Sequence, residues 1–164
     1  MAKNSIVYAT SANPPTWGHG DIMKRAASMF DTLYWVAAVN PKKELKISVE
    51  DRLSMMNEYV EYYKLKNVHV DFFSGAIVRF AQQKGAKFLL RGLRNTSDFH
   101  AELELAAGNR GIDKEIETIC LFGKPHFATI SSSLIRELAT LGERIDQYVL
   151  PSVAKRIEKI YFSK

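Results

Sequence analysis

Residues 33–39 read LYWVAAV, an apolar run without the alternation expected of a half-exposed strand. Such a run is typical of a strand buried on both faces of a parallel sheet. Further apolar segments that predict strands lie at residues 6–9, 68–72, 88–90 and 118–122. Helical patterns fall at residues 18–30, 48–63, 74–83 and 97–108, from Ser131 onward, and at residues 151–161. This alternation predicts an α/β fold with a five-stranded, mostly parallel sheet and helices on both faces. Ligands of such sheets bind at the carboxyl ends of the strands.

Length and composition limit the class of protein. The chain has 164 residues, of which 46% are hydrophobic, and it contains no repeat or linker-like stretch. We therefore expect one domain over residues 1–164, ending in a helix at about residues 151–161. A single cysteine excludes a disulfide framework within the chain and fits a cytoplasmic protein. No stretch approaches the ~20 apolar residues of a membrane span, so no membrane partner is expected.

The charge balance favours an anionic ligand. Lysine and arginine total 23 against 18 aspartates and glutamates, a formal net charge of +5. The basic residues are scattered among acidic ones and form no basic arm or stripe, which argues against nucleic acid. Small phosphate compounds need only a few convergent cations, so they remain open as ligands.

Two motifs lie where an α/β sheet places its ligands. Residues 16–19 read TWGH after the first strand, where Gly18 allows close approach of a ligand and His19 can donate to a phosphate oxygen. Residues 91–94 read RGLR after the fourth strand, and the planar fork of arginine suits phosphate. The alternative interpretations are a capping histidine and two solvated arginines.

Two further segments belong to the same set. Residues 131–133 are three serines at a helix start, with Arg136 one turn further on. One of the serines can be a simple N-cap, but three exceed what capping requires and can form an anion cradle. Lys43 follows the second strand in a proline-containing loop, where a solvated lysine is the alternative.

Other residues carry weaker signals. Asp21 is expected in the first helical turn, where a carboxylate favours the helix dipole. Cys120 lies in an apolar strand and is interpreted as a buried core thiol. The remaining histidines show no metal-ligand spacing, and no glycine-rich Walker or dinucleotide-binding loop is present.

Taken together, the TxGH, RGLR and ISSSxxR motifs resemble those of the bacterial phosphopantetheine adenylyltransferases, members of the nucleotidyltransferase superfamily. The resemblance covers residues 6–153 and implies a Rossmann-like fold. It also implies adenylyl transfer from ATP to 4′-phosphopantetheine, which gives dephospho-coenzyme A and pyrophosphate in coenzyme A biosynthesis. Magnesium would accompany the triphosphate, held by phosphate oxygens and water without a dedicated protein metal site. The family further implies a homohexamer.

The resemblance assigns roles residue by residue. The catalytic positions would be His19, Lys43 and Arg91. The ATP-binding positions would be Ser11, Ala12, His19, Gly92, Leu93, Arg94, Glu102, Phe127, Ala128, Thr129, Ile130, Ser131, Ser132 and Ser133. The phosphopantetheine-binding positions would be Ser11, Lys43, Ala76, Ile77 and Arg91.

The first loop departs from the family pattern. The family usually has Gly-Thr/Ser-Phe-Asp-Pro, whereas residues 10–14 read TSANP, so Thr10 and Asn13 replace a glycine and an aspartate. Thr10 restricts a backbone that must approach phosphate, which predicts weak ATP binding that Thr10→Gly improves. Ala101 also replaces an aromatic residue. Two alternatives follow: a nucleotidyltransferase with a different acceptor, or a catalytically silent nucleotide-binding homologue.

Overall fold

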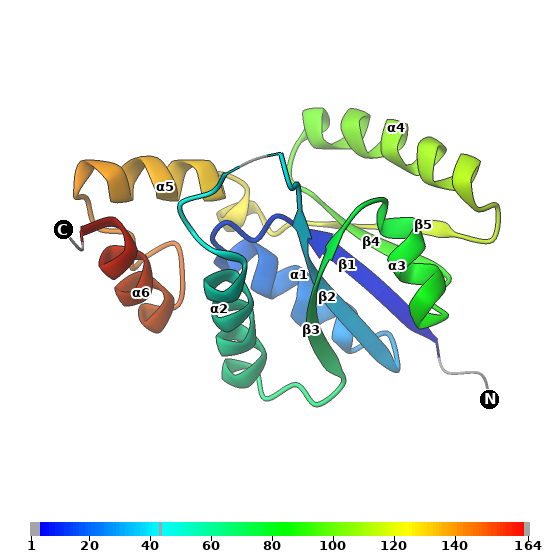
Figure 1. The fold of residues 1–164 in the computed structure, drawn as a ribbon, viewed down its shortest axis with the longest axis horizontal. Helices are drawn as coiled ribbons and strands as arrows, with labels where there is room; N and C mark the ends of the chain where they lie inside the picture. Colours follow the sequence, from blue (N-terminus) through cyan, green and yellow to red (C-terminus); the bar gives the residue numbers. More distant parts are fainter. Residues whose placement is uncertain (1–3, 43, 163–164) are drawn as a thin grey trace.

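The computed structural model describes residues 4–42 and 44–162, which form alternating strands and helices (Figure 1). The strands are β1 (Ser5–Thr10), β2 (Thr32–Val39), β3 (Val68–Ser74), β4 (Phe88–Leu93) and β5 (Glu117–Phe122). The helices are α1 (Trp17–Ala27), α2 (Val49–Tyr62), α3 (Ile77–Lys84), α4 (Thr96–Ile112), α5 (Ser132–Leu141) and α6 (Pro151–Phe162), with a 3-10 turn at Pro125–Phe127.

The five strands form one parallel sheet in the order β3-β2-β1-β4-β5. This confirms the predicted Rossmann-like α/β fold, and every strand pair is parallel. The order reverses between β1 and β4, because the chain crosses from β3 back over the sheet to reach β4. A crevice opens at such a switch point beyond the carboxyl ends of the strands, which is where ligands of these folds bind.

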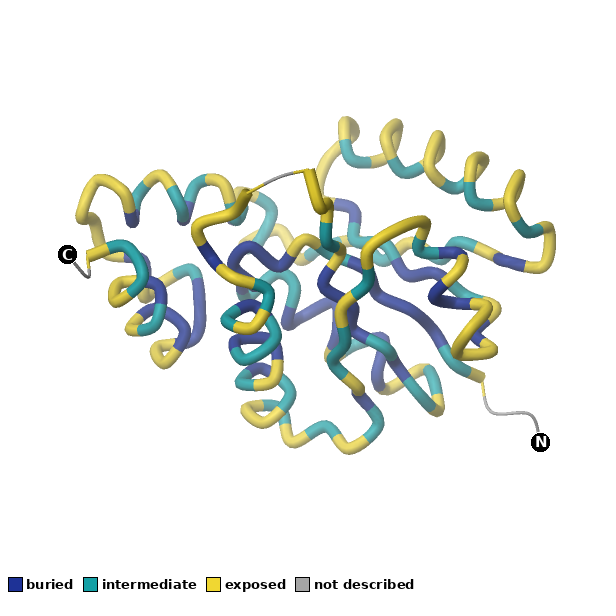
Figure 2. The backbone as a smooth tube through the Cα atoms, in the orientation of Figure 1, coloured by how far each residue is buried: buried dark blue, intermediate teal, exposed yellow. Residues whose placement is uncertain are grey.

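Two clusters of buried side chains cover the two faces of the sheet. The larger cluster joins β1 and β2 to α1, α2, α5 and α6, with Trp35 fully buried at its centre. The smaller cluster packs α3 against the opposite face through Val78 and Phe80. Figure 2 shows the burial concentrated along the central strands. These two apolar layers fix the strand ends that carry the polar loops described below.

Local sequence signals explain most helix ends. The Ser48 hydroxyl accepts from the backbone N–H of Asp51 at the start of α2, and Ser131 caps α5 by accepting from the N–H of Leu134. Gly85 and Gly142 end α3 and α5 in the left-handed conformation that glycine adopts without strain. Both serine caps match the sequence predictions.

Three local expectations are wrong. Ser74 ends β3, and α3 starts only at Ile77 without a side-chain cap, because the third strand continues beyond residue 72. Asp21 lies in the second turn of α1, where its carboxylate pairs with Arg25 and Lys124. Cys120 is exposed, because β5 is the edge strand and alternate residues face outward.

None of the helices within residues 4–42 and 44–162 is both long enough and apolar enough for a membrane crossing.

Candidate active site

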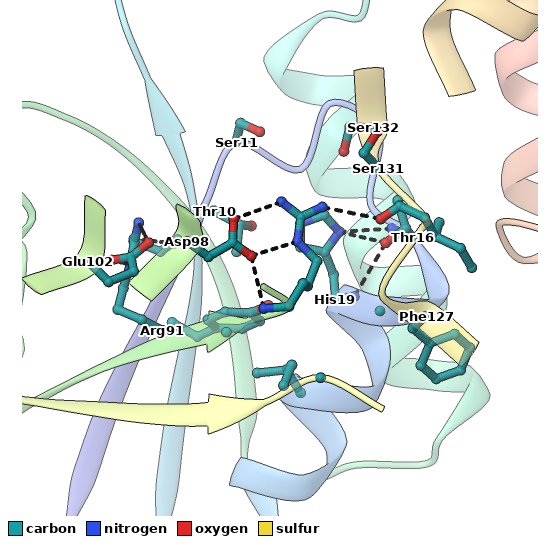
Figure 3. A pocket seen from close by; sticks show the side chains of 18 of the residues that line it. Thr10, Ser11, Thr16, His19, Arg91, Asp98, Glu102, Phe127, Ser131 and Ser132 are labelled. Atoms are coloured by element: carbon teal, nitrogen blue, oxygen red, sulfur yellow. Dashed lines mark hydrogen bonds and ion pairs between the residues drawn. The ribbon is translucent and has the colours of Figure 1, made fainter. Parts of the chain in front are cut away.

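A cavity of about 320 Å³ lies at the carboxyl ends of β1 and β4, at the switch point of the sheet. Its walls come from the β1–α1 loop, the start of α1, the β4–α4 segment, the turn before α5 and the start of α5. Figure 3 shows Arg91 and Glu102 on one side of this cavity and His19 and Thr16 on the other. Most of the predicted positions line it: Ser11, His19, Arg91, Gly92, Arg94, Glu102, Phe127, Ile130, Ser131, Ser132 and Ser133.

His19 is held by a reciprocal cap at the start of α1. Thr16 is the N-cap, and its hydroxyl accepts from the N–H of His19 at 3.4 Å. The backbone N–H of Thr16 in turn donates to Nδ1 of His19 at 3.1 Å (Figure 3). A backbone N–H can only donate, so Nδ1 must be the unprotonated nitrogen. The neutral imidazole therefore carries its proton on Nε2, the nitrogen left to donate to a ligand.

The surroundings of His19 keep this ring neutral. Burial, with a contribution from the positive charge of Arg94, lowers the pKa of His19 to about 4. At neutral pH the ring is a hydrogen-bond donor without a net charge. The capping alternative and the ligand-binding prediction for His19 are therefore compatible, because each uses a different ring nitrogen.

Arg91 is fixed at the end of β4 by a carboxylate and a carbonyl. Its Nε and Nη2 form a fork on the two carboxylate oxygens of Glu102, the second contact at 2.7 Å, and Nη1 donates to the carbonyl of Ala9 at 3.0 Å. Within the part of the chain that the structure describes, these partners occupy three of the five N–H donors of the guanidinium. The other two remain available to a ligand, and the fork restricts rotation of the group.

Arg94 is positioned by the start of α4. Its guanidinium donates to both carboxylate oxygens of Asp98, at 3.1 and 3.3 Å, and to the carbonyl of Ile130 at 3.3 Å. Burial acts to raise the pKa of Asp98, but the hydrogen bonds and charge of Arg94 outweigh it and lower that pKa. Asp98 therefore stays ionised and holds a second cation at the cavity.

The serine motif connects the start of α5 to the first loop. Ser131 is the N-cap, whereas the Ser132 hydroxyl donates to the carbonyl of Pro14 at 2.7 Å. Arg136 donates to the carbonyl of Asn13 at 2.6 Å and to the Ser133 hydroxyl at 3.1 Å. Arg136 is not among the residues that line the cavity, and its contacts brace the first loop. The first backbone N–H groups of α5 remain the anion-binding feature of this segment.

The unusual first loop has its own internal partners. Thr10 lines the cavity, and its Oγ1 accepts from the indole Nε1–H of the fully buried Trp35 at 3.2 Å. Arg52, only 2% exposed, donates to the carbonyls of Ser11 and Ala38 at 2.9 and 3.4 Å. Arg52 thus joins the ends of β1 and β2 behind the cavity. Neither contact follows from the family motif.

Some predicted positions lie away from this cavity. Ala12 is buried in the first loop with a φ of 44°, and Leu93 is buried at the end of β4; neither lines the cavity. The other predicted residues outside its lining are Ala76, Ile77, Ala128 and Thr129. Ile77 packs against the smaller apolar cluster. Lys43 lies outside the described residues.

The cavity also includes residues outside the assigned binding positions: Tyr8, Ala9, Ile22, Asp98 and Gly123, together with Thr10, Thr16 and Gly18 from the first loop and the TWGH motif. Thr16 carried a signal in the sequence. A reciprocal cap pairs an N-cap threonine with a side chain three residues later that accepts from the N-cap N–H, and His19 stands at that position. Tyr8 carried none, since a tyrosine in an apolar strand is indistinguishable from a core residue.

The assembled site suits phosphate chemistry. Two guanidiniums, a neutral imidazole N–H and a helix N-terminus all face one cavity, while the two carboxylates lining it are paired with the arginines. Over residues 4–42 and 44–162, no three His, Cys, Asp or Glu side chains gather in a way that could hold a metal ion. The site can bind and neutralise polyanions, and it offers no activated protein nucleophile among these lining groups.

Comparison with known proteins gives the class first. The model of the cytidylyltransferase-like family matches residues 7–138, which include most of β1, the other four strands and the three motifs. The fold is also that of a nicotinic acid mononucleotide adenylyltransferase from Plasmodium falciparum solved with NaAD. That structure aligns with a TM-score of 0.73 over 98% of this chain and 97% of its own, at 16% identity. The fold and the family model define a nucleotidyltransferase.

Closer relatives define the family within that class. The phosphopantetheine adenylyltransferase of Desulfatibacillum aliphaticivorans is 39% identical over 157 residues, covering 96% of this chain and 89% of that protein. The phosphopantetheine adenylyltransferase of Caldanaerobacter subterraneus subsp. tengcongensis is 36% identical over 151 residues, covering 92% of this chain and 93% of that protein. The chain belongs to the phosphopantetheine adenylyltransferase family, as its motifs predicted.

Proposed function

We propose that the chain transfers the adenylyl group of ATP to 4′-phosphopantetheine, giving dephospho-coenzyme A and pyrophosphate. Family membership supports the reaction. The observation that carries the proposal to this chain is the convergence of His19, Arg91 and Arg94 on one cavity at the switch point. Bringing two polyanions together is the main obstacle to this reaction, and these groups supply the positioning and neutralisation that it requires.

The reaction proceeds in line at the α-phosphorus. An oxygen of the acceptor phosphate forms the new bond to phosphorus while the bond to the bridging oxygen of the β-phosphate breaks, and pyrophosphate leaves with the electron pair. The acceptor is already anionic, so no base or covalent intermediate is needed. His19 donates from Nε2 to an α-phosphate oxygen, where negative charge develops. Removing a donor of this kind costs roughly 10²–10³-fold in rate at comparable sites.

The two arginines divide between the substrates. Arg91, fixed by Glu102, binds the acceptor phosphate with its remaining donors. Arg94 and the N-terminus of α5 would bind the triphosphate, and Phe127, which also lines the cavity, would contact the nucleotide. Lys43 stays the predicted cation between the two phosphates. Magnesium enters as part of the MgATP substrate, because the carboxylates lining the cavity are occupied by arginines.

The remaining parts of the prediction concern the rest of the chain. Ala76 and Ile77, between β3 and α3, lie at the carboxyl edge of the sheet and would contact the pantetheine arm. Residues 1–164 would act as one domain, and a cytoplasmic location stays a prediction from the single cysteine.

A homohexamer is the assembly that the family implies. Helix α4 supports an assembly of some kind, because its described residues include none that is buried (Figure 2). Phe99, Leu103 and Leu105 are each about half exposed or more on this helix. Monomeric proteins rarely leave such a face uncovered. Sedimentation equilibrium should give a mass near six times the 18.6 kDa of one chain, and a concentration-independent monomer would refute the assembly.

The function is tested by pyrophosphate release with a panel of nucleotides and acceptors. We expect release with ATP and 4′-phosphopantetheine, and little with CTP or with nicotinic acid mononucleotide. Release with another acceptor only would show a diverged nucleotidyltransferase. ATP binding in calorimetry without release from any acceptor would show a silent homologue.

A further inference from the structure

Tyr8 lies on the floor of the cavity, in the carboxyl half of β1. Its side chain is only 4% exposed, and its ring stacks on the indole of Trp35 with 6.2 Å between ring centres and 15° between planes. Stacking and burial restrict the ring to one orientation. Tyr8 is nevertheless a cavity-lining residue, so part of this rigid side chain faces the space that a ligand would fill.

The hydroxyl is the part of Tyr8 that lies under the β4–α4 segment. A Cβ atom built on Gly92 would lie 3.9 Å from Tyr8 Oη and 3.4 Å from Ile22 Cγ1. Gly92 itself lines the cavity and has no side chain. Because Gly92 has no side chain, the space beside the hydroxyl is left open, and a ligand can come close to the backbone there.

No hydrogen bond joins Tyr8 Oη to any residue in the ranges 4–42 and 44–162. This differs from Tyr59, another buried tyrosine of the same apolar cluster, whose hydroxyl accepts from the N–H of Leu150 at 3.1 Å. Tyr8 Oη is also not among the fully buried polar atoms that lack a partner in the described residues, so the atom is accessible from the cavity that Tyr8 lines. A rigid hydroxyl that faces a cavity and lacks a protein partner is suited to a ligand oxygen.

The charges around Tyr8 fit an anionic or hydroxyl-rich ligand. Burial raises the pKa of Tyr8 well above its usual range, although the nearby charges of Arg91 and Arg94 act to lower it. The group is thus a neutral O–H donor at every pH at which the protein works. It can donate to a phosphate or ribose oxygen without repelling it, and the two arginines attract such an oxygen to the same place.

We propose that Tyr8 is a further substrate-binding residue, whose hydroxyl donates a hydrogen bond to an oxygen of the bound adenylyl donor. The inference rests on the proposed function and adds a position outside the recognised motifs. Because the hydroxyl has no protein partner, its removal should weaken ligand binding without weakening the fold. A tyrosine with only a packing role would show the opposite pattern.

The test compares Tyr8→Phe with Tyr59→Phe, each of which removes the hydroxyl of a buried tyrosine and keeps the ring. For Tyr8→Phe we expect about a tenfold higher Kd for ATP by calorimetry, the size expected when a hydrogen bond to a charged oxygen is lost, and an unchanged melting temperature of the free protein. For Tyr59→Phe we expect a lower melting temperature and an unchanged Kd, because its bond to Leu150 is structural.

The wild type is assayed beside both variants, so that the two proposals can fail separately. If the wild type releases pyrophosphate with ATP and 4′-phosphopantetheine but Tyr8→Phe binds ATP equally well, only the role of Tyr8 is overturned. A melting temperature of Tyr8→Phe reduced as far as that of Tyr59→Phe would also overturn it. If the wild type binds ATP but forms no product, the proposed function fails while the Kd comparison still decides the inference.

Titrations with adenosine and with ATP show which oxygen accepts the hydrogen bond. If Tyr8→Phe loses affinity for both ligands, the acceptor is a ribose oxygen; if it loses affinity for ATP alone, the acceptor is a phosphate oxygen.

Discussion

Replacing Thr10 should show whether its hydrogen bond to Trp35 stabilises the unusual first loop. Thr10 Oγ1 is the acceptor for the indole N–H of Trp35, which is 0% exposed. Thr10→Val keeps the shape and removes the acceptor, so a buried donor loses its partner at a cost of about 1–3 kcal/mol. Thr10→Gly also removes the acceptor, and it lowers stability by roughly a further 0.5–1 kcal/mol through backbone entropy, because Thr10 is the last residue of a strand. A change of 1 kcal/mol shifts the melting temperature by about 2–4 °C for a chain of this size.

Urea unfolding followed by circular dichroism measures these differences. Thr10→Ser is the matched control, since it keeps the hydroxyl and should stay close to the wild type. In a Trp35→Phe background the donor is absent, so Thr10→Val should then cost much less than in the wild type. Equal stabilities of Thr10→Val and Thr10→Ser would refute the role of the hydrogen bond. The same variants decide the prediction from the sequence that Thr10→Gly tightens ATP binding: a weaker affinity together with lower stability would show a loop adapted to threonine.

Three further predictions concern the cavity and its support. Burial lowers the pKa of His19 from 6.5 to about 4, so the unfolded chain takes up a proton between these values before the native state does. Stability should therefore fall by up to about 3 kcal/mol as the pH drops from 6.5 to 4, and His19→Gln should flatten this part of the urea-unfolding profile while greatly lowering kcat. Arg91→Ala should raise the KM for 4′-phosphopantetheine far more than the KM for ATP. If only the KM for ATP changed, the assignment of Arg91 to the acceptor phosphate would be wrong, and the two phosphate sites would have to be exchanged. Arg52→Lys keeps the charge but not the geometry that joins the carbonyls of Ser11 and Ala38, so it should lower stability by about 1–3 kcal/mol and raise the KM for ATP. Unchanged unfolding and kinetics of Arg52→Lys would show that the buried arginine does not position the loop.

The sequence was informative where a local pattern decides the structure. The apolar run at residues 33–39 is β2, and Ser48 and Ser131 are helix caps, because a side chain and a backbone N–H three residues apart can find each other without the rest of the fold. The exposure of Cys120 could not be predicted, since it depends on β5 being the edge strand, and the strand order is a property of the whole chain.

Within the site, the motifs indicated which residues gather but not how each is held. Arg91 and Glu102 were assigned separately, and their forked ion pair depends on how α4 leaves β4. The partner of Thr10 is 25 residues away on β2, and no local pattern predicts it. The role of Arg136 as a brace depends on the first loop passing beside α5, a contact between segments 123 residues apart.

The central claim is that the cavity positions two phosphate compounds for direct transfer, without a covalent adenylyl-enzyme. The most direct measurement is the configuration at the α-phosphorus of the dephospho-coenzyme A thio-analogue formed from 4′-phosphopantetheine and ATP with a chiral α-thiophosphate. A single in-line displacement predicts inversion of that configuration. Retention would require two displacements through a protein nucleophile and would contradict the account, as would the absence of this product.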